Sequence, residues 1–166
     1  LQELDCTTLV ENVLALTLCA KTKQYTFKQF CTFLQKIRYD NGVISYPTRL
    51  HYFSEWINDN TKQGFVKEIN TPNPPFKSQQ ILDLHYMSTQ HHKYPMLVQN
   101  PSWIKEIRTM EQMVSGKTVN YIPKGILNNS SLIKDIIKDG DIIAIVTAKK
   151  GLDTSHLGFA SWHNGQ

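Results

Sequence analysis

The sequence predicts an α+β fold, in which helices come first and an antiparallel sheet follows in the last third of the chain. Apolar residues recur at helical spacing from Leu9 to about Ala20, which is typical of an amphipathic helix. Residues 141–147 form instead a continuous, largely β-branched run, which predicts a strand buried on both faces. A chain of 166 residues with 40% hydrophobic content can bury one sizeable core. This order of elements favours an α+β protein over an α/β protein.

The first two helices are predicted from their start signals. Thr8 and Glu11 have the spacing of a capping box at the start of the first helix. A second helix is expected to begin at Thr26, with Gln29 three residues later. The side chains that this helix is expected to bury are Phe27, Phe30, Leu34 and Ile37.

A third helix is expected after the strong turn signal at residues 40–42. Pro47 and Thr48 are expected to open it, and residues 60–64 are expected to end it. Its apolar face would consist of Leu50, Phe53, Trp56 and Ile57.

The middle of the chain is irregular, and residues 65–116 are expected to form a helical and loop-rich insertion. Three prolines within residues 71–75 predict a surface loop. Residues 81–89 are interpreted as a strand and residues 91–95 as a polar loop. A fourth helix is expected from residues 100–101 to Val114.

The C-terminal part carries mainly strand signals. Residues 118–122 and 157–162 are expected to be strands, and a short helix capped by Ser130 or Ser131 is expected between them. Asn164 and Gly165 form a hairpin signal close to the last residue.

Composition excludes several classes of protein. The net charge of +4 comes without any run of five or six lysines or arginines, so nucleic-acid binding is not indicated. No stretch approaches the roughly 20 apolar residues that a membrane-spanning helix needs. The three cysteines cannot all pair and lack metal-type spacing, so the sequence favours at least one free thiol and no cofactor.

Cys6 is the candidate nucleophile. It lies directly ahead of the first apolar helical run, and a helix N-terminus favours the thiolate, which is the nucleophilic form. Taken alone, the position is more often that of a buried core cysteine. The backbone N–H of Cys6 is a candidate donor for an oxyanion hole, and Asp5 is interpreted as a helix cap.

His156 is the candidate general base. It stands at the start of a strand-like segment, after a polar loop at residues 149–155. A cysteine at a helix start and a distant histidine on a strand are the parts of a cysteine-dependent acyl-transfer site. The alternative is a histidine that merely bonds the backbone at a strand end.

Six ordered segments favour the catalytic interpretation of Cys6 and His156 over the structural one: residues 4–11, 37–39, 49–56, 121–124, 140–144 and 151–158. Together they resemble the N-acetylmuramoyl-L-alanine amidase-like family of bacterial cell-wall hydrolases, a branch of the NlpC-type papain-like superfamily. The resemblance covers nearly all 166 residues. It implies a single papain-like catalytic domain over residues 1–166, with Cys6 as nucleophile and His156 as base.

The resemblance also implies the substrate, the place of action and a third catalytic group. The substrate would be peptidoglycan fragments, cut between N-acetylmuramic acid and L-alanine in the cell envelope, in the periplasm or after export. Alternatives are a γ-D-glutamyl-diamino acid endopeptidase and a non-catalytic wall-binding module. A polar residue on the strand after the histidine strand normally orients the histidine, and we expect it beyond Gln166, in a chain truncated at both ends.

Substrate contacts are expected from Arg49, Tyr52, Ser88 and Ser155. An arginine can clamp a carboxylate, and a tyrosine can stack on a sugar or peptide face; the alternative for Arg49 is a solvated side chain. A zinc site at His85, His91 and His92 is rejected, because adjacent histidines rarely face one ion and no carboxylate or thiol completes the spacing.

Overall fold

The computed structural model describes residues 4–69, 76, 78–127 and 133–163, and within these ranges the chain combines helices with short antiparallel strands. The helices are α1 (Cys6–Thr22), α2 (Phe27–Arg38), α3 (Phe53–Lys62), α4 (Tyr86–Thr89), α5 (Pro95–Gln99) and α6 (Trp103–Val114), with the 3-10 turns η1 (Asp40–Gly42), η2 (His91–Lys93) and η3 (Lys124–Ile126). The strands are β1 (Ser78–Ile81), β2 (Thr118–Tyr121), β3 (Ile142–Val146) and β4 (Thr154–Phe159). The predicted α+β class is confirmed. None of the helices in these ranges is long and apolar enough to cross a bilayer.

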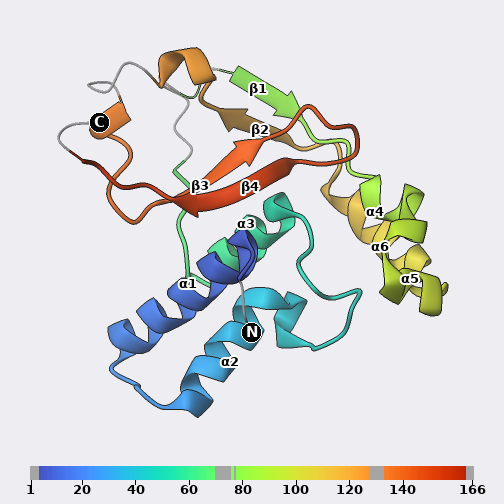
Figure 1. Ribbon diagram of the computed structural model, residues 1–166, viewed down its shortest axis with the longest axis horizontal. Helices are drawn as coiled ribbons and strands as arrows, with labels where there is room; N and C mark the ends of the chain where they lie inside the picture. The colour runs from blue at the N-terminus through green and yellow to red at the C-terminus, as the bar shows by residue number, and fades with distance from the viewer. Residues whose placement is uncertain (1–3, 70–75, 77, 128–132, 164–166) are drawn as a thin grey trace.

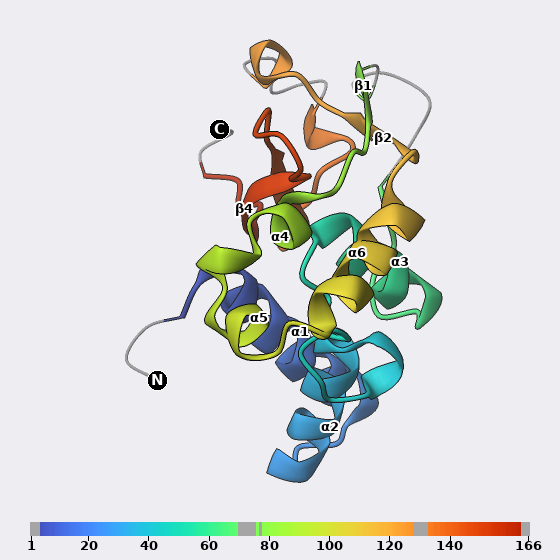
Figure 2. The same cartoon turned by 90° about the vertical axis from the view of Figure 1, so that its right-hand side faces the viewer.

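The strands form two separate antiparallel pairs. In one, β1 lies beside β2 with Ser78 opposite Tyr121; in the other, β3 lies beside β4 with Ile145 opposite His156. Figure 1 shows α1, α2 and α3 gathered beside the β3–β4 pair, while α4, α5 and α6 form a second group of helices at the other side. Figure 2 turns this second group toward the viewer. Helix α1 packs on β4, which places the helix start next to the strand.

Helix α1 begins at Cys6, so the predicted placement of this cysteine at a helix start is confirmed, but the helix starts earlier than a Thr8 cap would allow. Asp5 is the capping residue, and its side chain accepts a hydrogen bond of 2.6 Å from the backbone N–H of Thr8. Glu11 takes no part in a capping box, because it is fully buried and paired with arginines. The expected structural role of Asp5 is therefore confirmed, and the Thr8–Glu11 capping box is wrong.

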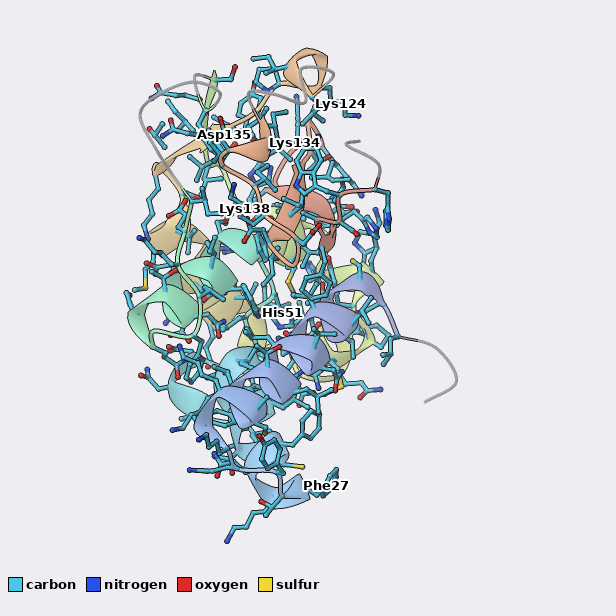
Figure 3. All side chains as sticks on the ribbon, turned by 90° about the vertical axis from the view of Figure 1, so that its left-hand side faces the viewer. Phe27, His51, Lys124, Lys134, Asp135 and Lys138 are labelled. Carbon is cyan, nitrogen blue, oxygen red and sulfur yellow. The ribbon has the colours of Figure 1, made fainter. Side chains whose placement is uncertain are left out.

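The predicted start of α2 is confirmed, because the Thr26 side chain accepts from the Gln29 N–H at 3.1 Å. Ile37 near its end is fully buried. The prediction that Phe27 is buried is wrong, since 79% of this residue is exposed. Phe27 stands in the first turn of α2, at the far end of the molecule, where Figure 3 shows it projecting outward.

Helix α3 begins at Phe53, six residues later than Pro47. Pro47 and Thr48 lie in a turn, where the Thr48 and Ser45 hydroxyl groups are 3.0 Å apart. The start of α3 is capped from a distant part of the chain: Asp153 accepts from the backbone N–H of Ser54 at 2.7 Å. A capping residue that is 99 positions away in sequence cannot be recognised from local spacing.

The middle segment departs most from the expectation. Residues 81–89 are not one strand, because β1 ends at Ile81 and α4 begins at Tyr86. The expected loop at residues 91–95 is the turn η2 followed by the start of α5. Helix α6 ends at Val114 as predicted. The loop predicted within residues 71–75 lies outside the described residues.

In the C-terminal part, the positions of the strands agree with the predictions better than the burial of β3 does. Strand β2 matches the prediction, and β4 begins at Thr154, three residues before the predicted start. Strand β3 lies where expected, but it is not buried on both faces: Ile145 is 42% exposed, because β3 belongs to a pair of strands that leaves part of its surface open. The Ser130 or Ser131 cap and the Asn164–Gly165 hairpin lie outside the described residues.

Two clusters of buried apolar residues hold these elements together. The first, called here the α1 cluster, consists of Val10, Leu14, Ala15, Leu18, Ile37, Leu50, Trp56 and Leu157. The second, called the α6 cluster, consists of Tyr52, Leu82, Leu84, Met87, Leu97, Ile107 and Val114. Because Leu50 and Tyr52 belong to different clusters, the segment that leads into α3 runs along the border between them.

Candidate active site

A cavity of about 140 Å³ lies where the start of α1, the segment leading into α3 and the start of β4 meet. Its lining consists of Cys6, Thr7, Leu50, His51, Tyr52, Phe53, Trp56 and residues 152–157. Both apolar clusters contribute to this wall, so the cavity lies at their border.

Cys6 is the first residue of α1 and is half-buried in the cavity wall. Its Sγ atom lies 4.0 Å from the Thr7 hydroxyl oxygen. The hydrogen bond from the backbone N–H of Thr8 lowers the pKa of Asp5, so this cap is ionised at neutral pH. The other two cysteines of the chain do not line the cavity: Cys19 is buried and Cys31 is exposed.

His156 lies in β4 and lines the same cavity as Cys6, although 150 residues separate the two in the sequence. The packing of α1 on β4 brings them together. Its ring makes no hydrogen bond with any residue in the described part of the chain. Of the polar residues that follow it, Ser161 and His163 contact each other, with 3.1 Å between Oγ and Nε2.

Asp153 is a buried member of the cavity wall that the sequence analysis missed. One carboxylate oxygen accepts from the backbone N–H and the hydroxyl of Ser54, and the other accepts from the backbone N–H of Thr154 at 2.7 Å. It therefore joins the start of α3 to the start of β4, three residues before His156. Its only local signal was an aspartate next to the predicted histidine strand.

His51 is a second histidine in the cavity wall. Its Nε2 lies 2.9 Å from the backbone carbonyl oxygen of Tyr46. Burial lowers the pKa of His51 to about 4, and the nearby Arg49 charge acts in the same direction, while the hydrogen bond to Tyr46 opposes them. The ring is therefore neutral at pH 7. Figure 3 shows it in the interior, near α1.

The predicted substrate contacts fall in different places. Ser155 and Tyr52 line the cavity. The Tyr52 hydroxyl points elsewhere: it donates to Glu111 Oε1 at 2.7 Å and accepts from the Met87 N–H at 3.0 Å. Tyr52 therefore lines the cavity while being 2% exposed, and its phenol oxygen is bound by residues on the α6 side.

Arg49 and Ser88 are not among the described residues that line the cavity. Arg49 forms an ion pair with Glu11, at 2.8 Å between Nη2 and Oε1, and donates to the Arg38 carbonyl. The backbone N–H of Ser88 donates to Glu111 at 3.1 Å. Both residues contact buried glutamates and do not line the cavity.

Two of the three histidines of the middle segment have polar partners in the protein. His85 lies 3.3 Å from an Asp83 carboxylate oxygen, and His91 Nδ1 lies 3.0 Å from the Ser88 carbonyl oxygen. Within the described ranges, no three histidine, cysteine, aspartate or glutamate side chains are grouped as metal ligands.

The profile of one protein family, described as N-acetylmuramoyl-L-alanine amidase-like, matches residues 1–166. The chain belongs to this family. The resemblance inferred from the six sequence segments is therefore confirmed, and the chain is a member of an amidase-like family of cell-wall hydrolases. A search of curated proteins found no significant match.

Solved structures similar to this chain include one named an amidase and one given a different name. An N-acetylmuramoyl-L-alanine amidase from Bacteroides uniformis is 41% identical, with a TM-score of 0.89 over 99% of this chain and 67% of its own. A Bacteroides fragilis protein described as a candidate xylanase is also 41% identical, with a TM-score of 0.87 over 98% of this chain and 70% of its own. A protein from Legionella pneumophila is 25% identical, with a TM-score of 0.67 over 97% of this chain and 62% of its own.

Proposed function

We propose that this amidase-like chain hydrolyses an amide bond of peptidoglycan, with Cys6 as nucleophile and His156 as general base. The observation that supports the proposal is that both residues line one cavity, with Cys6 at a helix start and His156 on the strand that packs against that helix. The proposed unit is a papain-like catalytic domain of NlpC type over residues 1–166, with an insertion around residues 65–116.

The reaction proceeds in two halves. His156 takes the proton from the Cys6 thiol, and the sulfur attacks the carbonyl carbon of the amide. His156 then gives this proton to the leaving nitrogen, the C–N bond breaks, and a thioester remains on Cys6. In the second half, His156 takes a proton from water as the water oxygen attacks the thioester carbon. The C–S bond then breaks, the carboxylic acid is released, and His156 returns the proton to the Cys6 sulfur.

The oxyanion that forms during both attacks needs hydrogen-bond donors aimed at it. The backbone N–H groups in the first turn of α1 point out of the helix start, and the N–H of Cys6 is the proposed first donor. The proposed third group of the site is a polar side chain that orients the His156 ring.

The proposed substrate is a muropeptide of the cell envelope, cut between N-acetylmuramic acid and L-alanine. Support comes from the family description and from the name of the Bacteroides uniformis relative. Ser155 and the Tyr52 ring are the proposed direct substrate contacts. Arg49 and Ser88 are proposed to affect substrate binding without touching the substrate, through their contacts with Glu11 and Glu111. A γ-D-glutamyl-diamino acid endopeptidase and a non-catalytic wall-binding module are the competing functions.

Mass spectrometry of purified muropeptides after incubation with the protein tests this proposal. We expect the disaccharide and the free stem peptide as products. Cleavage after D-glutamate would identify the endopeptidase instead, and intact muropeptides would contradict both activities. Cys6→Ala should abolish turnover while changing the free energy of unfolding by no more than about 1–2 kcal/mol, because little packing is removed.

Chelation provides a second test of the cysteine mechanism. Because no step of the proposed reaction uses a Lewis acid, turnover should be unchanged after dialysis against EDTA. Loss of turnover that added zinc restores would contradict the mechanism.

A further inference from the structure

His51 places a ring in the wall of the cavity that holds Cys6 and His156, and the proposed reaction gives it no part. The ring is held in one orientation. Its Nε2 contacts the Tyr46 carbonyl at 2.9 Å, and its centroid lies 4.7 Å from the Tyr46 ring. The Tyr46 ring stacks in turn on Trp103 at 5.8 Å, so the support extends to α6.

This contact fixes the tautomer of His51. A carbonyl oxygen can only accept a hydrogen bond, so Nε2 carries the proton and donates it. In a neutral ring the other nitrogen, Nδ1, is then an acceptor with a free lone pair. Burial and the Arg49 charge both keep the ring neutral at pH 7.

Nδ1 is the ring nitrogen that remains available, on a residue that lines the cavity. It makes no hydrogen bond with the described residues, and it is not among the polar atoms that are sealed in the interior without a partner. Tyr46, which holds the other nitrogen, does not line the cavity. A fixed acceptor in so small a space loses its water when a substrate enters, and it must then be matched by a substrate donor.

We propose that Nδ1 of His51 accepts a hydrogen bond from a backbone N–H of the substrate's stem peptide and thereby positions the scissile amide on Cys6. The donor assigned is the N–H of the peptide bond that follows L-alanine, because the scissile nitrogen has to stay free to receive a proton from His156. His51 is thus a specificity-determining contact for a peptide stem, and this role rests on the proposed function.

Two substitutions separate this role from a purely structural one. In His51→Asn the side-chain amide can place its oxygen near the position of Nδ1, but it cannot reach the Tyr46 carbonyl. In His51→Gln the amide nitrogen can replace Nε2 as donor to Tyr46, but no acceptor is left at the Nδ1 position. We expect His51→Gln to lower kcat/KM about 10- to 100-fold and His51→Asn to lower it only a few-fold.

A structural role for His51 predicts the reverse order, and wild-type kcat/KM in His51→Gln would overturn the proposal. Thermal unfolding of both variants shows whether each is folded. A substrate change needs no variant at all: a depsipeptide muropeptide, in which an ester oxygen replaces the assigned N–H, should lose about 10- to 100-fold in kcat/KM on the wild-type protein. Equal rates on the two substrates would also overturn the proposal.

The readouts distinguish failure of this inference from failure of the proposed function. If the wild-type protein cleaves neither muropeptide, the proposed function fails. Calorimetric binding of the two muropeptides to the Cys6→Ala protein then still tests His51. Tighter binding of the parent compound supports the hydrogen bond, and equal affinities overturn it.

Discussion

The α1 cluster and the α6 cluster each adjoin one buried glutamate, and the two carboxylates have different kinds of partner. In the α1 cluster, Glu11 is fully buried and lies 2.9 Å from Arg38 and 2.8 Å from Arg49. In the α6 cluster, Glu111 is 1% exposed and accepts hydrogen bonds from the Tyr52 hydroxyl and the Ser88 N–H. One carboxylate is held by cations and the other by neutral donors.

This difference shows how each region supports the cavity between them. The ion pairs of Glu11 tie α1, which carries Cys6, to the end of α2 and to the segment before α3. The hydrogen bonds of Glu111 tie α6 to α4 and to Tyr52, which is one of the residues that line the cavity. Loss of the negative charge should therefore lower the free energy of unfolding more at Glu11, on the side of Cys6, than at Glu111.

Replacement of each glutamate by glutamine tests this contrast most strongly. Glu11→Gln leaves the half-buried Arg49 and Arg38 without a counter-charge and should lower the free energy of unfolding by about 3–5 kcal/mol. Glu111→Gln keeps an oxygen that can accept from Tyr52 and Ser88, so it should cost about 1 kcal/mol or less. Urea unfolding of the two variants provides the comparison, and equal losses would remove the distinction between the clusters.

Substitution of Asp153 tests the border between the two clusters, where the cavity lies. Asp153→Ala removes the cap of α3 and leaves the N–H groups of Ser54 and Thr154 without their acceptor, which should cost about 2–3 kcal/mol. Ser54→Ala removes only one hydroxyl and should cost about 1 kcal/mol. We expect Asp153→Ala to reduce turnover below that of Ser54→Ala even at a temperature where both are folded. Unchanged turnover would mean that Asp153 does not position the His156 strand.

A smaller effect is expected from Glu55 in α3. Burial raises the pKa of Glu55 to about 8, helped by the carboxylates of Asp40, Asp59 and Asp153. The folded state thus holds a proton between pH 4.5 and 8 that the unfolded state releases, so this contribution to stability is complete below pH 4.5 and is lost as the pH rises through 8. Glu55→Gln should flatten this decline by about 1–2 kcal/mol, a value reduced for partial exposure. Unfolding curves at pH 5 and pH 8.5 measure it, and parallel declines in both proteins would contradict the shift.

The features that the sequence predicted correctly are local ones. The placement of Cys6 at a helix start, the Thr26 cap and the turn at residues 40–42 depend on residues within four positions of one another. Strand β2 was found from its residue types and flanking turn signals.

The features that it missed depend on distant partners. Glu11 looked like a capping-box residue, and only the folded chain brings Arg38 and Arg49 to it. The cap of α3 comes from Asp153, and the orientation of His51 depends on the Tyr46 carbonyl. Periodicity also misjudged Phe27, because an apolar residue at a helix end can extend beyond the neighbour that would cover it.

The same limit applied to the candidate site. The sequence offered Cys6 and His156 through local context and a family resemblance, but their shared cavity is a property of the packing of α1 on β4. Nothing in the spacing of Arg49 or Ser88 indicated that both would support buried glutamates instead of lining the cavity.

The rates at which the three cysteines react with iodoacetamide test the central claim, that Cys6 is an activated nucleophile, most directly. Exposure alone favours Cys31, which is exposed, over the half-buried Cys6 and the buried Cys19. Peptide mapping of the folded protein over time gives the three rates separately. The proposed transfer of the thiol proton to His156 predicts that Cys6 is alkylated fastest, ahead of Cys31 and then Cys19, and that His156→Ala slows Cys6 alone. Alkylation of Cys31 before Cys6, or no effect of His156→Ala, would contradict the account.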